Sequence, residues 1–166
     1  MKKKRKKGSG GLPGIDKMKC PYCSSPVVLR SADGIYRENH YNTKLYVCSR
    51  YPVCDAYVRV QNGTKNTPIG SMANGELRAL RCEAHRSFDR IHETGLMSKQ
   101  DAYAWLANIL AAPMSHAHIG HLREHYCRVV IDESQRFLVN NQQRLKRMRY
   151  PSIYPSASVS MVSGGD

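Results

Sequence analysis

The sequence has few acidic residues and lacks any long hydrophobic run. It contains 13 Asp and Glu against 26 Lys and Arg, a net charge of +13, and its mean hydropathy is −0.55. No stretch approaches the roughly 20 consecutive apolar residues that a membrane-spanning helix requires. We therefore expect no membrane segment, and the excess of positive charge favours a polyanionic partner.

Part of that charge is concentrated at the N-terminus. Residues 2–7 read KKKRKK, and glycines and a serine fill residues 8–11. This composition is typical of a nuclear-import tag with a flexible linker, although a native basic arm would look similar. No apolar core of a secretory signal follows it. We expect residues 1–16 to be a disordered tag and linker, and without these six charges the net charge is still +7.

Short β-branched and aromatic runs follow the linker. They stand at residues 27–29, 35–36, 45–47 and 57–60, with the hairpin-type turns Asp33-Gly34 and Asn62-Gly63 between or after them. Residues 63–74 are polar and contain glycine and proline, as a linker does. This pattern predicts a β-rich module over residues 17–66.

Apolar residues then recur at steps of three and four, the helical period. A first helix is expected to end at Gly95, and Ser98 with Asp101 forms a capping box that opens a second helix, which Pro113 ends. Ser115 is expected to cap a third helix that continues toward Leu145. The Ser-, Pro- and Gly-rich residues 150–166 are expected to form a disordered tail.

Four of the six cysteines lie close together in the sequence as two pairs. Cys20 and Cys23 form a Cys-x2-Cys pair, and Cys48 and Cys54 form a Cys-x5-Cys pair, with 24 residues between the two pairs. Four thiolates complete a tetrahedral shell around Zn²⁺ without an open position, which is the structural type of zinc site. We predict one structural Zn²⁺ held by Cys20, Cys23, Cys48 and Cys54. It would supply most of the folding free energy of so small a module.

A redox interpretation of the first pair stays open. Cys-Pro-Tyr-Cys is also the active-site sequence of glutaredoxins, and Thr67-Pro68 stands at a plausible distance for the cis-proline turn of that fold. A redox pair opens a helix, however, and here residues 24–28 read SSPVV, which favours a strand. The redox interpretation also gives Cys48 and Cys54 no role.

The predicted fold class is therefore α+β. A small β-rich four-cysteine zinc ribbon over residues 17–66 precedes a helical domain of about three helices over residues 67–149. The ribbon is expected to pack on the helices because it is too small to be stable alone.

The segment Cys48-Ser49-Arg50-Tyr51-Pro52-Val53-Cys54 resembles the C-terminal zinc ribbons of type IA DNA topoisomerases, which run Cys-Pro-x-Cys, a hairpin, and Cys-Ser-x-Tyr-Pro-x-Cys. The resemblance covers residues 19–60. This chain departs from it in a longer segment between the pairs and in Ser24, where glycine is usual. It implies binding of single-stranded DNA but not strand cleavage, because no topoisomerase catalytic domain is present.

Residues 18–130 also resemble a family of uncharacterised zinc-finger-containing proteins from bacteria and their phages. The resemblance is carried by the ribbon and by Leu77-Arg78 through His85 to Phe88-Asp89, Ala102-Tyr103-x-Trp105-Leu106 and His118-Ile119-Gly120. It implies a phage or prophage protein in the bacterial cytoplasm, or in the nucleus if the basic tag acts in a eukaryotic cell.

Tyrosines and basic residues alternate along the ribbon, as in proteins that bind single strands by stacking and by neutralising phosphates. The predicted nucleic-acid contacts are Arg37, Lys44, Tyr46, Arg50, Tyr51, Tyr57 and Arg59. These tyrosines could instead cover a small β-core, while the arginines only keep the module soluble. The alternative function is a protein-binding zinc module that inhibits or recruits a host nucleic-acid machine, a polymerase or a guide-RNA nuclease, since Tyr and Arg also dominate protein interfaces.

The histidines give little support for an enzyme. His121-Leu122-Arg123-Glu124-His125 matches the H-x-x-E-H pattern of inverted zinc peptidases, but no good third ligand follows it. We expect a non-enzymatic protein that has no small-molecule substrate and binds single-stranded DNA or RNA.

Overall fold

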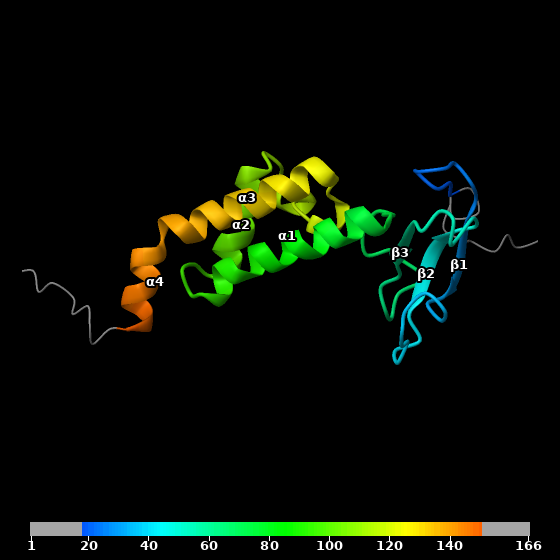
Figure 1. Cartoon of the computed structure of the whole chain (residues 1–166), viewed down its shortest axis with the longest axis horizontal. Helices are drawn as coiled ribbons and strands as arrows, with labels where there is room; N and C mark the ends of the chain where they lie inside the picture. Colours follow the sequence, from blue (N-terminus) through cyan, green and yellow to red (C-terminus); the bar gives the residue numbers. More distant parts are fainter. Residues whose placement is uncertain (1–17, 151–166) are drawn as a thin grey trace, which may run out of the picture. The chain divides into compact units, whose positions relative to one another are not determined.

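The computed structural model describes residues 18–150. It divides into two compact units after Arg78, and we call residues 18–78 the ribbon unit and residues 79–150 the helical unit (Figure 1). The predicted tag, 1–16, and almost all of the predicted tail, 150–166, lie outside the described residues. No helix among residues 18–150 is long and apolar enough to cross a membrane.

The ribbon unit is built on a three-stranded antiparallel sheet. Its strands are β1 (Val27–Ser31), β2 (Lys44–Cys48) and β3 (Tyr57–Arg59), in the order β1-β2-β3. The pairing of Val27 with Cys48 places one zinc-ligand candidate at the end of the central strand. The strands match the predicted runs, whereas residues 35–36 form part of the connection between β1 and β2.

The central strand β2 is covered on both faces of the sheet, and each face has a small core. Leu45 and Val47 point to one face, where Ala32, Ile35, Tyr36, Tyr51 and Tyr57 pack on them. We call this the tyrosine face. The opposite face, which we call the cysteine face, has a core of Cys20, Tyr46, Cys48, Ala56, Val58, Val60 and Met72. Because β2 is buried on both sides, its apolar residues form a continuous run rather than an alternating one.

The segment after β3 is not the linker that its composition predicts. Pro68 pairs with Val60 and Ala73 pairs with Tyr57 in isolated antiparallel bridges, and Met72 is buried in the cysteine face. The ribbon unit therefore extends past the predicted boundary at residue 66 to Arg78. The polar composition did not predict this packing, because only a few residues of the segment pack on the sheet or pair with it.

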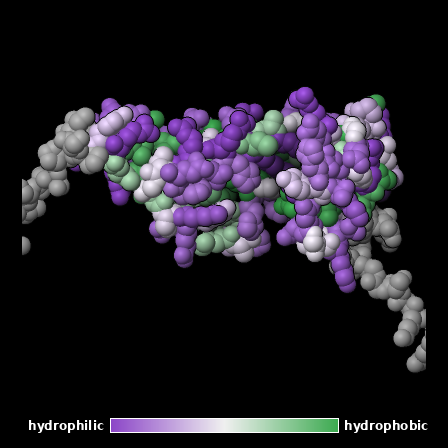
Figure 2. Space-filling model, turned by 90° about the horizontal axis from the view of Figure 1, so that it is seen from below, coloured by the Kyte–Doolittle hydropathy of each residue, from purple (hydrophilic) through white to green (hydrophobic). Residues whose placement is uncertain are grey.

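The helical unit contains four helices instead of about three, within the confirmed α+β class. They are α1 (Gly75–Glu93), whose first turn lies in the ribbon unit, α2 (Lys99–Ile109), α3 (Glu124–Asn140) and α4 (Gln142–Arg149). Phe88 and Ile91 of α1, Leu106 of α2 and Val130 of α3 are fully buried. As predicted, Gly95 follows α1 with φ +74°, and the Ser98 hydroxyl accepts the N–H of Asp101 to cap α2. Hydrophilic side chains cover most of the surface in Figure 2, and hydrophobic ones form small patches.

The third helix begins eight residues later than a cap at Ser115 predicts. Met114–His116 and Ile119–His121 form single 3₁₀ turns, and α3 starts only at Glu124. Ile119 and Leu122 are nevertheless buried. A three-residue spacing fits the 3₁₀ turn as well as the α-helix, which explains the misplaced start. A turn at Asn141 separates α3 from α4, although the prediction runs one helix through it.

Candidate metal centre

The four predicted cysteines converge on one point. Their Sγ atoms all lie within 4.8 Å of one another, and Cys20 to Cys54 is 3.6 Å while Cys23 to Cys48 is 3.4 Å. Four sulfurs in a tetrahedron around Zn²⁺, each about 2.3 Å from the ion, would lie about 3.8 Å apart. All six cysteines are free thiols. The donor set and its spacing therefore fit one structural Zn²⁺, as the sequence predicts.

The first cysteine pair sits in a tight turn that leads into a strand. Cys20 N–H donates to Ser25 O at 2.8 Å and Ser24 N–H to Cys20 O at 2.9 Å. Ser24 has φ +57°, the left-handed conformation that glycine adopts without cost. Because β1 and not a helix follows, the arrangement does not support the redox interpretation.

The second pair spans a compact loop joined to the first. Tyr51 N–H donates to Cys48 O at 3.0 Å, and Cys54 N–H donates to Arg50 O at 3.2 Å. Ser49 N–H donates to Pro26 O at 2.9 Å, which links this loop to the start of β1. The two loops thus hold two sulfurs each, and the sheet sets the distance between them.

Backbone N–H groups two residues further along the chain face three of the sulfurs. The Ser25 hydroxyl and N–H lower the pKa of Cys23 to about 6, whereas burial raises the pKa of Cys48 to about 12 against the N–H of Arg50. The N–H of Ala56 lowers the pKa of Cys54, but burial and the neighbouring thiols outweigh it and raise the pKa. Without a cation, Cys48 and Cys54 are therefore harder to deprotonate than Cys23. A divalent cation favours deprotonation, because it binds the thiolate form.

Asp55, the residue after the last ligand, connects the metal centre to the start of α1. Its Oδ2 accepts the Gly75 N–H at 2.7 Å and Arg78 Nη2 at 3.1 Å. Arg78 Nη1 donates to the carbonyl oxygens of Asp55, at 2.7 Å, and Ala73, at 2.5 Å. A Cβ at Gly75 would lie 2.6 Å from Asp55 Oδ2, so a side chain there would displace the Asp55 carboxylate from its present position. Sequence reasoning missed this network, since neither a motif nor a charge cluster marks Asp55 or Arg78.

The structure separates the predicted nucleic-acid contacts into two groups. Arg37, Lys44, Arg50 and Arg59 are exposed. Tyr46 is wrong as a stacking residue, because it is 1% exposed and its hydroxyl donates to Asn66 O at 2.9 Å. Tyr51 and Tyr57 are half-buried in the core of the tyrosine face, and the guanidinium carbon of Arg78 lies 3.7 Å from the centroid of the Tyr57 ring. The interpretation of the tyrosines as core residues is thus correct for Tyr46 and partly correct for these two.

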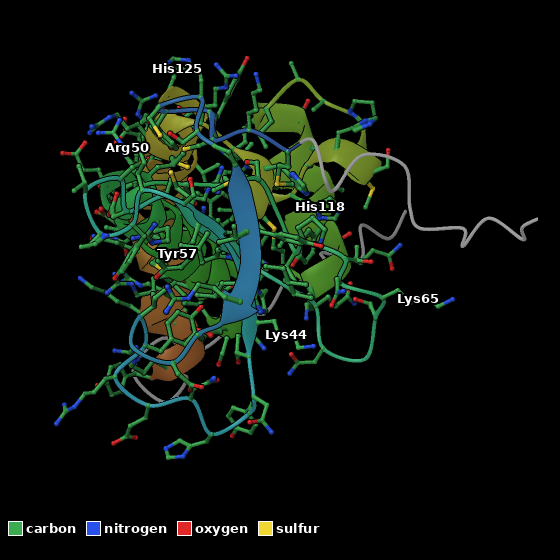
Figure 3. All side chains as sticks on the ribbon, turned by 90° about the vertical axis from the view of Figure 1, so that its right-hand side faces the viewer. Lys44, Arg50, Tyr57, Lys65, His118 and His125 are labelled. Atoms are coloured by element: carbon green, nitrogen blue, oxygen red, sulfur yellow. The ribbon has the colours of Figure 1, made fainter. Side chains whose placement is uncertain are left out.

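Two tyrosines of the ribbon unit are the exposed ones. Tyr41, between β1 and β2, is 80% exposed, and Tyr22, between the first two cysteines, is 42% exposed. Tyr22 was missed as a candidate contact, because it lies within the Cys-x2-Cys pair and outside the strands in which tyrosines and basic residues alternate. Figure 3 shows Tyr57 on one side of the sheet and Lys44 with Lys65 on the other, so the predicted contacts do not form one surface.

The histidines form no second centre in the described part of the chain. His121 lies in a 3₁₀ turn and His125 in α3, so the H-x-x-E-H residues do not share a helix. Within residues 18–150, the four cysteines are the only group of three or more potential metal ligands that lie close together.

Comparison with known proteins gives one match. The model of a family described as a zinc-finger-containing domain matches residues 16–137, well over half of the chain. No curated protein and no solved structure matches the chain. The match spans the four-thiol centre, the sheet, α1, α2 and most of α3. The chain therefore belongs to the family of proteins that contain this zinc-finger-containing domain.

Proposed function

We propose that the protein is a nucleic-acid-binding accessory protein of phage or prophage type that binds single strands through its zinc-stabilised ribbon unit. The observation that supports this most is a set of exposed cations without carboxylate partners. No ion pair within residues 18–150 involves Arg30, Arg37, Lys44, Arg50, Arg59 or Lys65. Cations that are not neutralised within the chain remain available to phosphates.

Two of these cations flank the centre of the tyrosine face. Arg30 pairs with Leu45 and Leu45 pairs with Arg59, so the three side chains form one row across the sheet. In the next row on the same face, Tyr57 lies opposite Val47. The Tyr36 ring lies edge-on to the Tyr57 ring, with 6.1 Å between the ring centroids. The basic row thus borders a half-buried aromatic surface against which the backbone of a strand could lie.

Zinc has no chemical step in this function. By holding both cysteine loops, it would fix the ends of β1 and β3 and therefore the spacing of Arg30 and Arg59. Base stacking would come from the exposed ring of Tyr41 more than from Tyr46 or Tyr57. In this proposal the protein binds nucleic acid and catalyses no reaction.

The salt dependence of binding tests the proposal. Fluorescently labelled single-stranded DNA and RNA 12-mers should bind with an affinity that falls linearly with salt concentration on logarithmic axes. Replacing Arg30 and Arg59 by Ala should reduce the slope by about 1.4, which corresponds to two phosphate contacts on a single strand. The matched control replaces Arg90 and Arg128, two exposed arginines of the helical unit, by Ala and should leave slope and affinity unchanged.

Two outcomes would contradict the proposal. The first is that neither DNA nor RNA binds at low salt although the protein holds its zinc. The second is that the control variant loses as much affinity as the ribbon variant. Zinc content is measured for every variant, so that loss of the metal is not mistaken for loss of a contact.

The open edge of β1 favours a second candidate, a protein-binding module that inhibits or recruits a host polymerase or guide-RNA nuclease. β3 is bordered by the bridges at Pro68 and Ala73, whereas the described residues contact the outer edge of β1 only at its start, where Val27 N–H donates to Met18 O at 3.1 Å. Val28 and Leu29 on β1 are 43% and 38% exposed. An extended segment of a partner could add to this edge. A protein recovered from host lysate after nuclease treatment, and lost when Leu29 is replaced by Pro in a variant that still holds zinc, would favour this candidate.

A further inference from the structure

A polar hollow lies at the end of the sheet opposite the metal centre. Its volume is about 300 Å³, at the small end of the range typical of ligand sites. Its lining includes Tyr41, Asn42, Lys44, Gln61, Asn62 and Asn66. It is therefore formed by the connection before β2 and the turn after β3, both within the ribbon unit.

The side-chain amides in this lining have no partners within the described chain. Four residues with amide side chains line the hollow, and none of these side chains forms a hydrogen bond with another of residues 18–150. Each amide offers a donor and an acceptor, the combination that pairs with the edge of a nucleobase. The lining holds one ammonium group, that of Lys44, and no carboxylate. This composition suits a base that carries a phosphate and does not suit a metal cation.

The turns that carry these amides are held by other groups. Gln61 N–H donates to Thr67 O at 2.7 Å, and the Thr64 hydroxyl donates to Gln61 O at 2.8 Å. The buried Tyr46 hydroxyl donates to Asn66 O at 2.9 Å and anchors the far side of the turn to the core. The shape of the hollow therefore does not depend on its amide side chains, which remain available to a ligand.

The hollow lies one strand position beyond the basic row of the tyrosine face, on the other side of the sheet. Val60 N–H donates to Lys44 O at 2.9 Å, next to the row that holds Arg30, Leu45 and Arg59. A strand whose phosphates contact Arg30 or Arg59 would have to pass around the end of the sheet to place a base in the hollow. The ring of Tyr41 stands at its rim, 80% exposed, where it could stack on a base.

We propose that this hollow receives one unstacked nucleobase of a bound single strand and makes binding depend on the identity of that base. The inference rests on the proposed function and adds a specificity site to it. Bases of single strands can be turned out of the stack and recognised on their edges, which a duplex does not permit. The Asn and Gln side chains would contact the base edge, Tyr41 would stack, and Lys44 would contact the adjoining phosphate.

Homopolymer binding tests this site. Labelled single-stranded 12-mers of adenine, cytosine and thymine, and RNA 12-mers of adenine, cytosine and uracil, are titrated by fluorescence anisotropy against the zinc-loaded full chain. The tightest and weakest oligonucleotides of a series should differ at least about fivefold, the lower limit of one bidentate amide–base contact. Replacing Gln61 and Asn62 by Ala should reduce that difference to less than twofold and leave the salt slope unchanged.

Matched variants separate this inference from the proposed function. Replacing Gln135 and Asn140, two exposed amide residues of α3, by Ala should leave the base preference intact. Replacing Arg30 and Arg59 by Ala should weaken binding of every oligonucleotide by a similar factor. Equal affinity for all homopolymers, or a preference that survives in the Gln61/Asn62 variant, would overturn the hollow as a base site while leaving the proposed function standing. Binding to none of the oligonucleotides would overturn the proposed function itself.

Discussion

The guanidinium of Arg78 lies over the ring of Tyr57, with its carbon 3.7 Å from the ring centroid. The same guanidinium donates to the carbonyl oxygens of Asp55 and Ala73 and pairs with the Asp55 carboxylate at 3.1 Å. One side chain in the first turn of α1 therefore joins β3, the segment paired with it and the residue that follows the last zinc ligand.

Replacing Arg78 by Met should destabilise the ribbon unit. Met fills similar space but removes the guanidinium hydrogen bonds and the cation–π contact. Ala73 O keeps the N–H of Tyr57 and the Asp55 carboxylate keeps the N–H of Gly75, whereas Asp55 O loses its guanidinium donor. We expect a loss of about 2–3 kcal/mol, measured by urea unfolding of the zinc-loaded protein. The matched change, Arg128→Met on the exposed surface of α3, should alter stability by less than about 0.5 kcal/mol. Equal effects of both changes would show that the network contributes little.

Removal of the metal should unfold the ribbon unit. The purified, reduced protein is expected to hold one Zn²⁺ per chain, and a strong chelator should abolish the β signal in circular dichroism because the sheet has only two small cores. Cys54→Ser should reproduce the loss. Cys82→Ser, at an exposed cysteine outside the centre, should keep the zinc and the β signal. A β signal that persists in the metal-free protein would contradict a metal-dependent fold.

The sequence was sufficient to predict the features set by spacing and period. The four cysteines, the strands, the end of α1 and the cap of α2 each depend on residues near one another in the chain, and each matches its prediction. Strand alternation also accounts for β3, where Val58 and Val60 lie in the core of the cysteine face and Tyr57 in the core of the tyrosine face.

The sequence was not sufficient where the outcome depends on which face of the sheet is covered. Tyr46 stands in a strand beside basic residues, as an exposed stacking tyrosine would, yet residues 61–73 return over it. Because this segment packs back on the sheet, the predicted linker is part of the ribbon unit. The partnership of Asp55 with Arg78 joins residues 23 positions apart and depends on that return as well. Such contacts follow from the tertiary arrangement and leave no local pattern.

Replacing Ser24 by Gly should stabilise the protein. Ser24 has φ +57°, which costs a residue with a Cβ about 1 kcal/mol, and its side chain is exposed. We expect a net gain of about 0.5 kcal/mol in urea unfolding, since glycine also makes the unfolded chain more flexible. Ser25→Gly is the contrasting control. It removes a hydroxyl that donates to Cys23 and should weaken zinc retention.

The carboxyl of Asp33 should titrate below its usual range. The Ser31 hydroxyl donates to it at 2.6 Å and the Asn39 amide at 2.9 Å, and these bonds lower its pKa. Because the pKa is lower in the folded state, the associated stability is present above the unfolded-state pKa. It is lost as the pH falls through the folded-state pKa.

NMR titration of the Asp33 carboxyl carbon measures this shift directly. Ser31→Ala should move the pKa of Asp33 toward its ordinary value, and Ser49→Ala, a change elsewhere on the exposed surface of the ribbon unit, should leave it where it is. An unchanged pKa in the Ser31 variant would show that Ser31 is not the main cause.

Tyr46 and Tyr41 should respond to substitution in opposite ways. Tyr46→Phe keeps the buried ring but leaves Asn66 O without its donor, so we expect a loss of about 1 kcal/mol in stability. Because that ring is 1% exposed, the affinity for a single-stranded 12-mer should stay within about twofold. Tyr41→Leu should instead leave stability unchanged and weaken binding by about 1 kcal/mol or more, the value of one stacked base. If Tyr46→Phe weakens binding as much as Tyr41→Leu does, exposure in this structure is a poor guide to which tyrosines meet the nucleic acid.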